Sequence, residues 1–333
     1  MITYFQIYFP FVKKSFTSTN EHHNETKNLD LDSKKIFADS KKLNGNYYAI
    51  LSMLLWSTGF PISEALLDVW DPLSLTFVRL IGAGIFLGIC TILFSKPYDL
   101  TTWPLKEAFL VGVIGTGFGT AFMNFGFRYS NPFNIAVIST MIPLISMIMG
   151  TIQKTERLTS RMAAAIFLSL IGGIMISVSN LENGSSFEGG EILMLISVIL
   201  WTWSMRQAVS LLLPIPTLPR VTLTMLSGAV VLVPIMALVH WLGITELVIF
   251  WSTTDIILVS WLSIFSIGLA TVIWYLSAES LGPTVAAIHL NIVPFYVLII
   301  TMLMGGKILI TQILGAVLVG VGVVTAQISR KQI

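Results

Sequence analysis

Long apolar runs, separated by short polar segments, make up the chain from Asn46 onward. There are ten such runs, and each is close to the ~20 residues that an α-helix needs to cross the hydrocarbon core of a bilayer. They cover 46–67, 72–95, 105–127, 131–152, 160–180, 189–212, 218–241, 255–277, 282–304 and 308–329. The pattern predicts an all-α integral membrane protein with ten transmembrane helices.

The first 45 residues follow a different pattern. A short apolar start is followed by a stretch rich in charged residues, Asn and Ser. It has neither the basic leader nor the small-residue cleavage site of a secretory signal peptide. His22 and His23 are adjacent, but no third ligand is spaced near them for a metal ion. We therefore expect residues 1–45 to form a flexible cytoplasmic tail.

The apolar runs contain an internal repeat. The segment MLLWSTGFPISEALL at 53–67 aligns with VILWTWSMRQAVSLL at 198–212, and residues 131–150 align with 282–301. The alignment pairs Trp56 with Trp201, Arg79 with Met225, Gly117 with Gly268, Asn124 with Tyr275, Thr140 with Asn291, Pro143 with Pro294 and Glu156 with Lys307. Because five is odd, a second unit of five spans enters the membrane from the opposite side. We expect two inverted-topology repeats of five helices each, at 46–180 and 189–329.

Composition supports the membrane class and excludes several functions. The chain is 55% hydrophobic and 11% charged, whereas soluble domains are about 25% charged. A net charge of +2 indicates no nucleic-acid surface, and the single cysteine, Cys90, excludes an intrachain disulfide. The spans carry no paired carboxylates, nucleophile with a base, or metal-binding cluster. We expect no enzymatic activity, no cofactor and no metal.

The distribution of Lys and Arg predicts the orientation. With the N-terminus in the cytoplasm, 16 of the 19 basic residues lie on the cytoplasmic side. These are seven in the tail and Lys96, Lys106, Lys154, Arg157, Arg161, Arg206, Arg220, Arg330 and Lys331. Arg128 and Lys307 fall outside, and Arg79 lies within a span. Both termini are therefore predicted to be cytoplasmic, in a multi-pass protein of the cell (plasma or inner) membrane.

Prolines inside the spans predict helix breaks. A proline lacks the N–H that would bond the carbonyl four residues earlier, so that carbonyl needs protein or cavity water as its partner. We expect breaks that face the bundle interior at Pro61, Pro143, Pro234 and Pro294. Asn291 and Thr140 each lie three residues before such a proline. Each is a candidate for a substrate cavity, the alternative being an interhelical hydrogen bond.

Other polar and aromatic residues in the spans also allow both a structural and a functional interpretation. His289 is either a neutral histidine bonded to a carbonyl or a cavity-facing group, and Asn124 and Tyr275 are candidate cavity residues. Arg79 and Glu64 could form a structural ion pair or snorkel to the interface; alternatively, Arg79 could act in gating or in gripping a carboxylate.

Two aromatic positions and one glycine run complete the candidates. Trp56 and Trp201 lie deep in their spans, where they either pack the core or form walls for a ligand. The glycine run GVIGTGFGT at 112–120 lies inside a span, and it favours close helix packing over phosphate binding.

Several motifs give the chain a family resemblance. The segments LLWSTGFP in the first span, PLSLTFVRL in the second and NIAVISTMIPL in the fourth, followed by Glu156, resemble the EamA-type branch of the drug/metabolite transporter superfamily. This resemblance implies a ten-helix carrier with two inverted five-helix halves and a central cavity, which often exports amino acids or related metabolites. The second half departs from the pattern, with Lys307 in place of Glu156 and Met225 in place of Arg79.

These observations favour a secondary transporter, expected to be an exporter, of a small neutral or zwitterionic metabolite such as an amino acid. The alternatives are a nucleotide-sugar or sugar-phosphate carrier and a nontransporting membrane scaffold or sensor. Phosphate recognition favours several buried Lys or Arg, and the spans supply only Arg79. The expected partners are a small-molecule substrate and the lipid bilayer, with a coupling proton and the oligomeric state left open.

The predicted orientation can be tested by cysteine labelling. In a Cys90→Ser background, Asn183→Cys should react with an impermeant thiol reagent added to intact cells, because its loop is external. Arg157→Cys should react only after permeabilisation. The reverse labelling pattern would contradict the orientation.

Overall fold

Helices make up the regular structure of this chain in a computed structural model, which describes residues 40–94, 100–130, 138–178, 189–244, 246–249, 251–303 and 309–328. These ranges contain no strand, so the predicted all-α class is confirmed for them. Most of the predicted tail, and the positions Asn183 and Lys307, lie outside them. Contacts divide the chain into the units Met1–Leu43 and Asn44–Ile333, and the second unit contains the helices below.

The helices of the first half begin with a helical segment over 44–57. It is followed by α2 (Gly59–Leu67), α3 (Pro72–Phe94), the short 3-10 turn η1 (Leu100–Thr102), α4 (Leu105–Val111), the π-helix η2 (Gly112–Gly119), α5 (Thr120–Arg128), α7 (Ile142–Ile152) and α8 (Ser160–Val178).

The second half repeats much of this order. It contains α9 (Gly190–Ala208), α10 (Thr217–Trp241), α11 (Thr253–Trp261), the π-helix η3 (Leu262–Leu269), α12 (Ala270–Leu281), α13 (Pro283–Ile288), the 3-10 segment η4 (His289–Ile292), α14 (Val293–Leu303) and α15 (Ile310–Ile328). In both halves a π-helix joins two α-helices, and further helices follow this pair. A π-helix in an α-helical segment often marks a functional site.

Five helices among the described residues are long and apolar enough to cross a membrane. They are Ser40–Leu67, Pro72–Phe94, Leu105–Arg128, Thr217–Trp241 and Thr253–Leu281. Shorter apolar helices cover Ile142–Ile152, Ser160–Met175 and Ile310–Ala326. The chain is a membrane protein by these features, and the number of ten spans stays a prediction.

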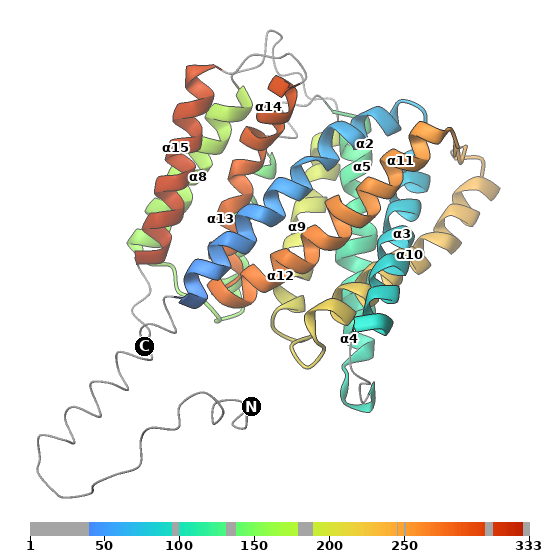
Figure 1. The fold of residues 1–333 in the computed structure, drawn as a ribbon, viewed down its shortest axis with the longest axis horizontal. Coiled ribbons are helices and arrows are strands. Elements are labelled where there is room, and N and C mark those ends of the chain that lie inside the picture. Colours follow the sequence, from blue (N-terminus) through green and yellow to red (C-terminus); the bar gives the residue numbers. More distant parts are fainter. Residues whose placement is uncertain are drawn as a thin grey trace, which may run out of the picture. The chain divides into compact units, whose positions relative to one another are not determined.

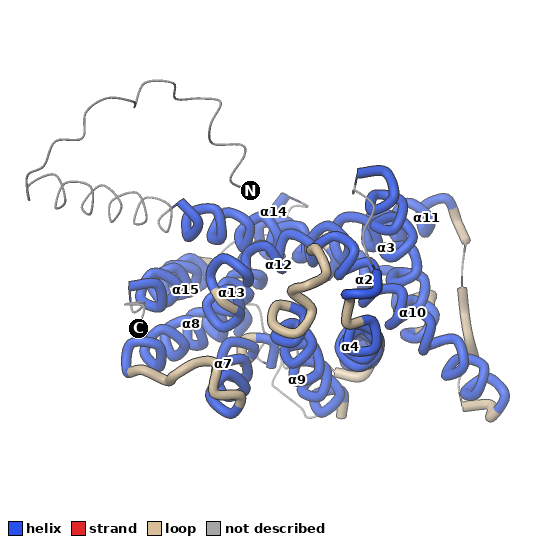
Figure 2. The backbone as a smooth tube through the Cα atoms, turned by 90° about the horizontal axis from the view of Figure 1, so that it is seen from below, coloured by secondary structure: helices blue, strands red, loops and turns tan. Residues whose placement is uncertain are grey.

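Helices far apart in sequence pack side by side. Figures 1 and 2 both show α8 beside α15, and α10 packs against α3. Small residues permit the first contact: a Cβ atom at Gly172 would lie 2.5 Å from the Gly315 carbonyl oxygen. Such close backbone approach is typical of helix pairs in membranes, where lipid removes the hydrophobic drive for association.

Three of the four predicted proline breaks are present. The first helical segment ends in a turn at Thr58, three residues before Pro61. Helix α7 begins at Ile142 with Pro143 in its first turn, and η4 precedes α14, in which Pro294 is the second residue. Each proline thus occupies the first turn of a new helix, where its missing N–H breaks no hydrogen bond.

Pro234 does not break its helix, so that prediction is wrong. Helix α10 runs from Thr217 to Trp241 with Pro234 inside it, and Pro234 is exposed rather than facing the bundle interior. A proline removes a single hydrogen bond, and α10 is held on its opposite side by buried residues such as Ala229 and Leu232.

The glycine run of the first half packs tightly, as its sequence predicted. At Gly115 an added Cβ atom would lie 1.8 Å from the Ser204 Cβ atom of α9. At Gly228 of α10 it would lie 2.8 Å from the Gly117 backbone nitrogen. Helix η2 is therefore in backbone contact with α10 and in close contact with α9.

This contact makes Gly228 sensitive to a single methyl group. Gly228→Ala should lower the stability of the purified protein by about 1–3 kcal/mol, because the backbone of η2 must move away. Gly320→Ala in α15 is the matched control, since no atom lies within 4 Å of its added Cβ. Thermal unfolding in detergent measures both variants, and equal midpoints would contradict the packing.

Candidate functional site

A cavity lies between helices from both halves of the chain, with a water-accessible volume of about 50 Å³. A single water needs about 10–15 Å³ on this measure, so the cavity has room for a few waters or a small solute. Its walls include Ser52, Met53, Trp56, Arg79, Thr116, Gly119, Thr120, Met123 and Ile142 from the first half. The second half supplies Met194, Ser197, Val198, Trp201, Ser204, Met205, Met225, Ile267, Ala270, Thr271, Trp274 and Tyr275.

Reciprocal hydrogen bonds join the two halves at the cavity. The Ser52 hydroxyl donates to the Ala270 carbonyl at 2.7 Å, and the Ser197 hydroxyl donates to the Gly119 carbonyl at 2.7 Å. In the sequence alignment Ser52 corresponds to Ser197 and Gly119 to Ala270. The two bonds are therefore the same interaction made once by each half.

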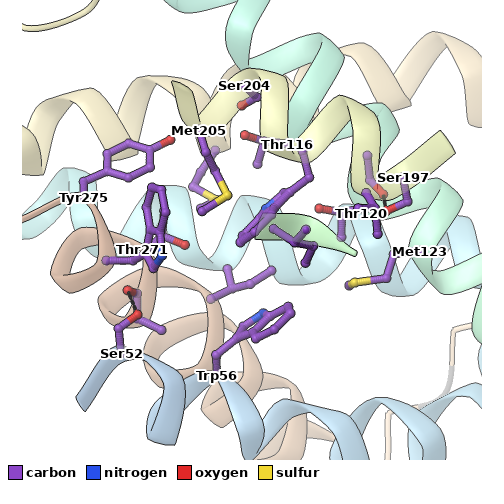
Figure 3. Close-up of a pocket in the computed structure, with 18 of the residues that line it drawn as sticks. Ser52, Trp56, Thr116, Thr120, Met123, Ser197, Ser204, Met205, Thr271 and Tyr275 are labelled. Carbon is purple, nitrogen blue, oxygen red and sulfur yellow. Dashed lines mark hydrogen bonds between the residues drawn. The ribbon is translucent and has the colours of Figure 1, made fainter. Parts of the chain in front are cut away.

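Three tryptophans form an aromatic wall of the cavity. The rings of Trp56 and Trp201 stack with centroids 5.7 Å apart and planes at 10°. Trp274 follows at 6.1 Å from Trp201, and its indole nitrogen has no hydrogen-bond partner in the described part of the chain. Figure 3 shows Trp56 among the hydroxyl and thioether side chains of neighbouring helices. Trp56, Trp201 and Tyr275 thus lie where the sequence placed them as cavity candidates.

Arg79 is the charged residue of the cavity wall. Helix α3 carries it in an apolar sequence, and only 2% of the residue is exposed. One guanidinium nitrogen, Nη1, donates to Asn124 Oδ1 at 3.3 Å, and Asn124 Nδ2 donates to Thr76 Oγ1 at 2.8 Å. Asn124 is therefore not a lining residue but a neighbour that holds Arg79.

A smaller cavity continues from the first one along α2. Both cavities share Trp56, Arg79 and Met123, and the smaller one is also lined by Gly59, Phe60, Ser63, Phe127 and Ser266. Arg79 lies at the junction between the two spaces.

The predicted pair of Arg79 with Glu64 is wrong. Glu64 is exposed on α2, whereas Arg79 is buried beside Asn124. A carboxylate stays hydrated at the surface, because burial would cost several kcal/mol.

Asn291 and Thr140 do not line the cavity either. Asn291 Nδ2 donates to Ser169 Oγ of α8 at 3.2 Å, and both Thr140 and Asn291 lie close to Gly173 of the same helix. Their place next to the helix breaks was predicted correctly. The side of the helix that they occupy faces α8, because the small residue Gly173 leaves room for them there.

His289 has the geometry of a packing residue rather than a cavity residue. It is buried, with Nδ1 3.1 Å from the Val285 carbonyl oxygen and Nε2 3.0 Å from Asn46 Oδ1. Both ring nitrogens are thus occupied by protein atoms. The 3-10 conformation of η4 places His289 against the first helical segment.

A buried charge network that the sequence did not predict surrounds Arg206. Arg206 was counted with the loops, but it lies in the last turn of α9 with 4% exposure. Its Nη1 is 3.2 Å from Glu156 Oε2, and its Nη2 donates to Thr155 Oγ1 at 2.7 Å. The Thr284 hydroxyl of α13 donates to the same Glu156 oxygen. The network ties the turn after α7 to two helices of the second half.

Arg220 forms a similar buried pair in the second half. Its Nη1 lies 2.7 Å from Glu279 Oε1 and also donates to the Ala208 carbonyl, while Nε and Nη2 donate to the Ile215 carbonyl. Like Arg206, it was counted with the loops. Both arginines lie inside predicted spans, 189–212 and 218–241, near the cytoplasmic end of each, which was the available signal that they lie at helix ends.

Sequence reasoning also missed the hydroxyl residues of the cavity. Thr120 and Thr271 correspond in the alignment of the two halves, and both line the cavity (Figure 3). Paired hydroxyls in apolar spans could have revealed them. Single Ser and Thr residues are common in membrane helices, however, because they bond their own backbone.

The comparisons with known proteins agree with these features. The sequence profile of the EamA-like transporter family matches residues 43–178. The chain is 25% identical over 224 residues to the uncharacterized transporter YyaM of Bacillus subtilis, covering 65% of this chain and 71% of YyaM. The first half of this chain thus matches the EamA-like transporter family, and the chain is similar to proteins that are named as transporters.

Two further similarities extend over more of this chain. It is 24% identical over 260 residues to the uncharacterized inner membrane transporter YedA of Escherichia coli K12, covering 77% of this chain and 81% of YedA. A solved structure described only as a crystal structure of a protein has a TM-score of 0.71 at 16% identity. It covers 88% of this chain and 100% of the other. At 16% identity, the similarity to this solved structure shows the fold alone.

The Arg206 network should behave as a coupled unit. Glu156→Gln should destabilise the protein by less than the about 3–5 kcal/mol of a fully buried pair, because Glu156 is 20% exposed. Arg206→Met combined with Glu156→Gln should cost less than the sum of the single changes. Thermal unfolding of the two single variants and the double variant measures these effects, and Arg157→Gln is the control because Arg157 is exposed. Strictly additive effects would contradict the coupling.

Proposed function

We propose that this protein is a secondary transporter of the plasma or inner membrane that exports a small neutral or zwitterionic metabolite, such as an amino acid. The solute binds in the cavity between the two halves and is exposed alternately to the two sides. The observation that carries the proposal is the cavity itself, which is lined by corresponding residues of both halves, and the reciprocal bonds of Ser52 and Ser197 join the halves at its wall.

The repeated elements support an inverted arrangement of two five-helix units. Helices η2 and η3, α7 and α14, and α8 and α15 occur at corresponding places in the two halves. Binding sites at the interface of inverted repeats are typical of secondary transporters, in which one unit rocks against the other. Non-α backbone at η2 and η3 is tolerated in a membrane where it is covered by protein or faces a cavity.

The charged networks supply a gate in this mechanism. Arg206 and Glu156 connect the two halves at the end of α9, whereas the smaller cavity extends from Arg79 along α2. On the predicted topology the Arg206 network lies on the cytoplasmic side. Opening towards the cytoplasm then requires this network to separate, and the structure corresponds to a state closed on that side.

The composition of the cavity favours a small metabolite over the alternatives. A nucleotide sugar or sugar phosphate needs several cations, and the described residues that line the cavity include a single one, Arg79. A scaffold or sensor does not require an internal cavity with three tryptophans and paired hydroxyls.

Transport by proteoliposomes tests the proposed function. Radiolabelled amino acids and nucleotide sugars are offered with and without a proton gradient, and we expect uptake of at least one amino acid. Trp201→Ala should reduce that uptake at least tenfold, because it removes a cavity wall. Trp241→Ala is the control, since Trp241 is 80% exposed at the end of α10. Uptake of nucleotide sugars alone would overturn the proposal.

A further inference from the structure

Arg79 differs from the other buried arginines of the described chain in its partners. Arg206 and Arg220 each contact a carboxylate, at 3.2 and 2.7 Å. Within the described residues Arg79 forms no ion pair, and its Nη1 donates to the neutral amide of Asn124. Its Nε atom has no hydrogen-bond partner within the described ranges. A cation buried without a counter-charge costs several kcal/mol, so an anion would bind here favourably.

The surroundings keep the guanidinium of Arg79 in place. Asn124 is fully buried, and its Nδ2 donates to the Thr76 hydroxyl, so that Oδ1 is left to accept from Arg79. The Thr76 hydroxyl in turn donates to the Pro72 carbonyl at 2.6 Å. This chain of bonds holds one edge of the guanidinium from α3 and α5. The Nε atom remains available to a ligand.

Position also favours binding of a solute at Arg79. The residue lines both cavities, and no Asp or Glu occurs among the described residues that line either of them. An anion in the cavity therefore meets one positive charge and no negative one. Trp274, with an indole nitrogen that also lacks a partner, offers a neutral donor on the same cavity wall.

We propose that Arg79 determines specificity by binding a carboxylate of the solute, so that the transported species carries one anionic carboxylate group. The inference rests on the proposed transport function and specifies a carboxylate as the group by which the solute is recognised. A planar guanidinium matches a carboxylate in geometry and in charge, whereas a doubly charged phosphate would keep an unbalanced negative charge. The remainder of the solute lies against Trp56 and Trp201. Among the described residues, no carboxylate lines the cavity to bind an amino group of the solute.

Matched acids and amides test the proposal without transport. The purified protein is heated in chloride-free buffer with propionate or propionamide, phenylacetate or phenylacetamide, and L-leucine or L-leucinamide. We expect at least one acid to raise the unfolding midpoint while its amide does not, since binding to the native state stabilises it. The proposal would be overturned if no acid raised the unfolding midpoint more than its amide does. An equal rise of the unfolding midpoint with sodium chloride alone would also overturn the proposal, because it would assign the site to inorganic anions.

Variants of Arg79 separate recognition from folding. Arg79→Met introduces the residue type found at the corresponding position of the second half, Met225. This variant should lose the preference for acids over amides. Arg79→Lys keeps the charge but loses the planar fork, so acid affinity should fall about tenfold or more. Arg157→Met is the control, because Arg157 is exposed outside the cavity. An unchanged acid preference in Arg79→Lys, or in folded Arg79→Met, would overturn the assignment.

The two proposals can fail separately. If proteoliposomes transport neutral solutes, and Arg79→Met leaves that transport unchanged, the role of Arg79 is wrong and the transport function stands. If acids bind through Arg79 but no solute of the transport panel crosses the membrane, the transport function is wrong and the binding site stands.

Discussion

The requirement that every backbone polar group inside a membrane has a partner governs this structure. Lipid offers no hydrogen bonds, so the chain forms helices wherever it crosses apolar surroundings. Departures from the α-helix are then restricted to places covered by protein or facing a cavity. In this protein they occur at Thr58, at η2 and η3, and at η4. Two of them, η2 and η3, contribute directly to the cavity wall.

Close helix contacts follow from the same environment. Because apolar side chains gain little by leaving lipid, helices associate through fit and through bonds between polar groups. The contact of Gly117 with Gly228 brings η2 onto α10, and the hydroxyls of Ser52 and Ser197 bind carbonyls of the opposite half. These interactions are small individually. Together they set the spacing at which a cavity remains between the halves.

Buried charge distinguishes the cavity from the rest of the interior. At the ends of α9 and α10, arginines are balanced by Glu156 and Glu279, and such pairs hold parts of the chain together. Arg79 is held by a neutral amide instead. A protein keeps an unbalanced buried cation at a cost to stability, and functional sites are the usual places where such a cost is retained. The wall of tryptophans beside it offers a large apolar surface to the remainder of a solute.

Three features followed from the sequence alone: the helical class, the breaks next to Pro61, Pro143 and Pro294, and the correspondence of Trp56 with Trp201. Each of these depends on local chemistry or on the order of residues along the chain. Only the tertiary structure decided that Asn291 faces α8, that Glu64 is exposed and that Glu156 reaches Arg206. The physical reason is that a polar residue in an apolar helix has no fixed direction until neighbouring helices are placed. A rotation of a few tens of degrees in a helix then separates a cavity residue from a packing residue.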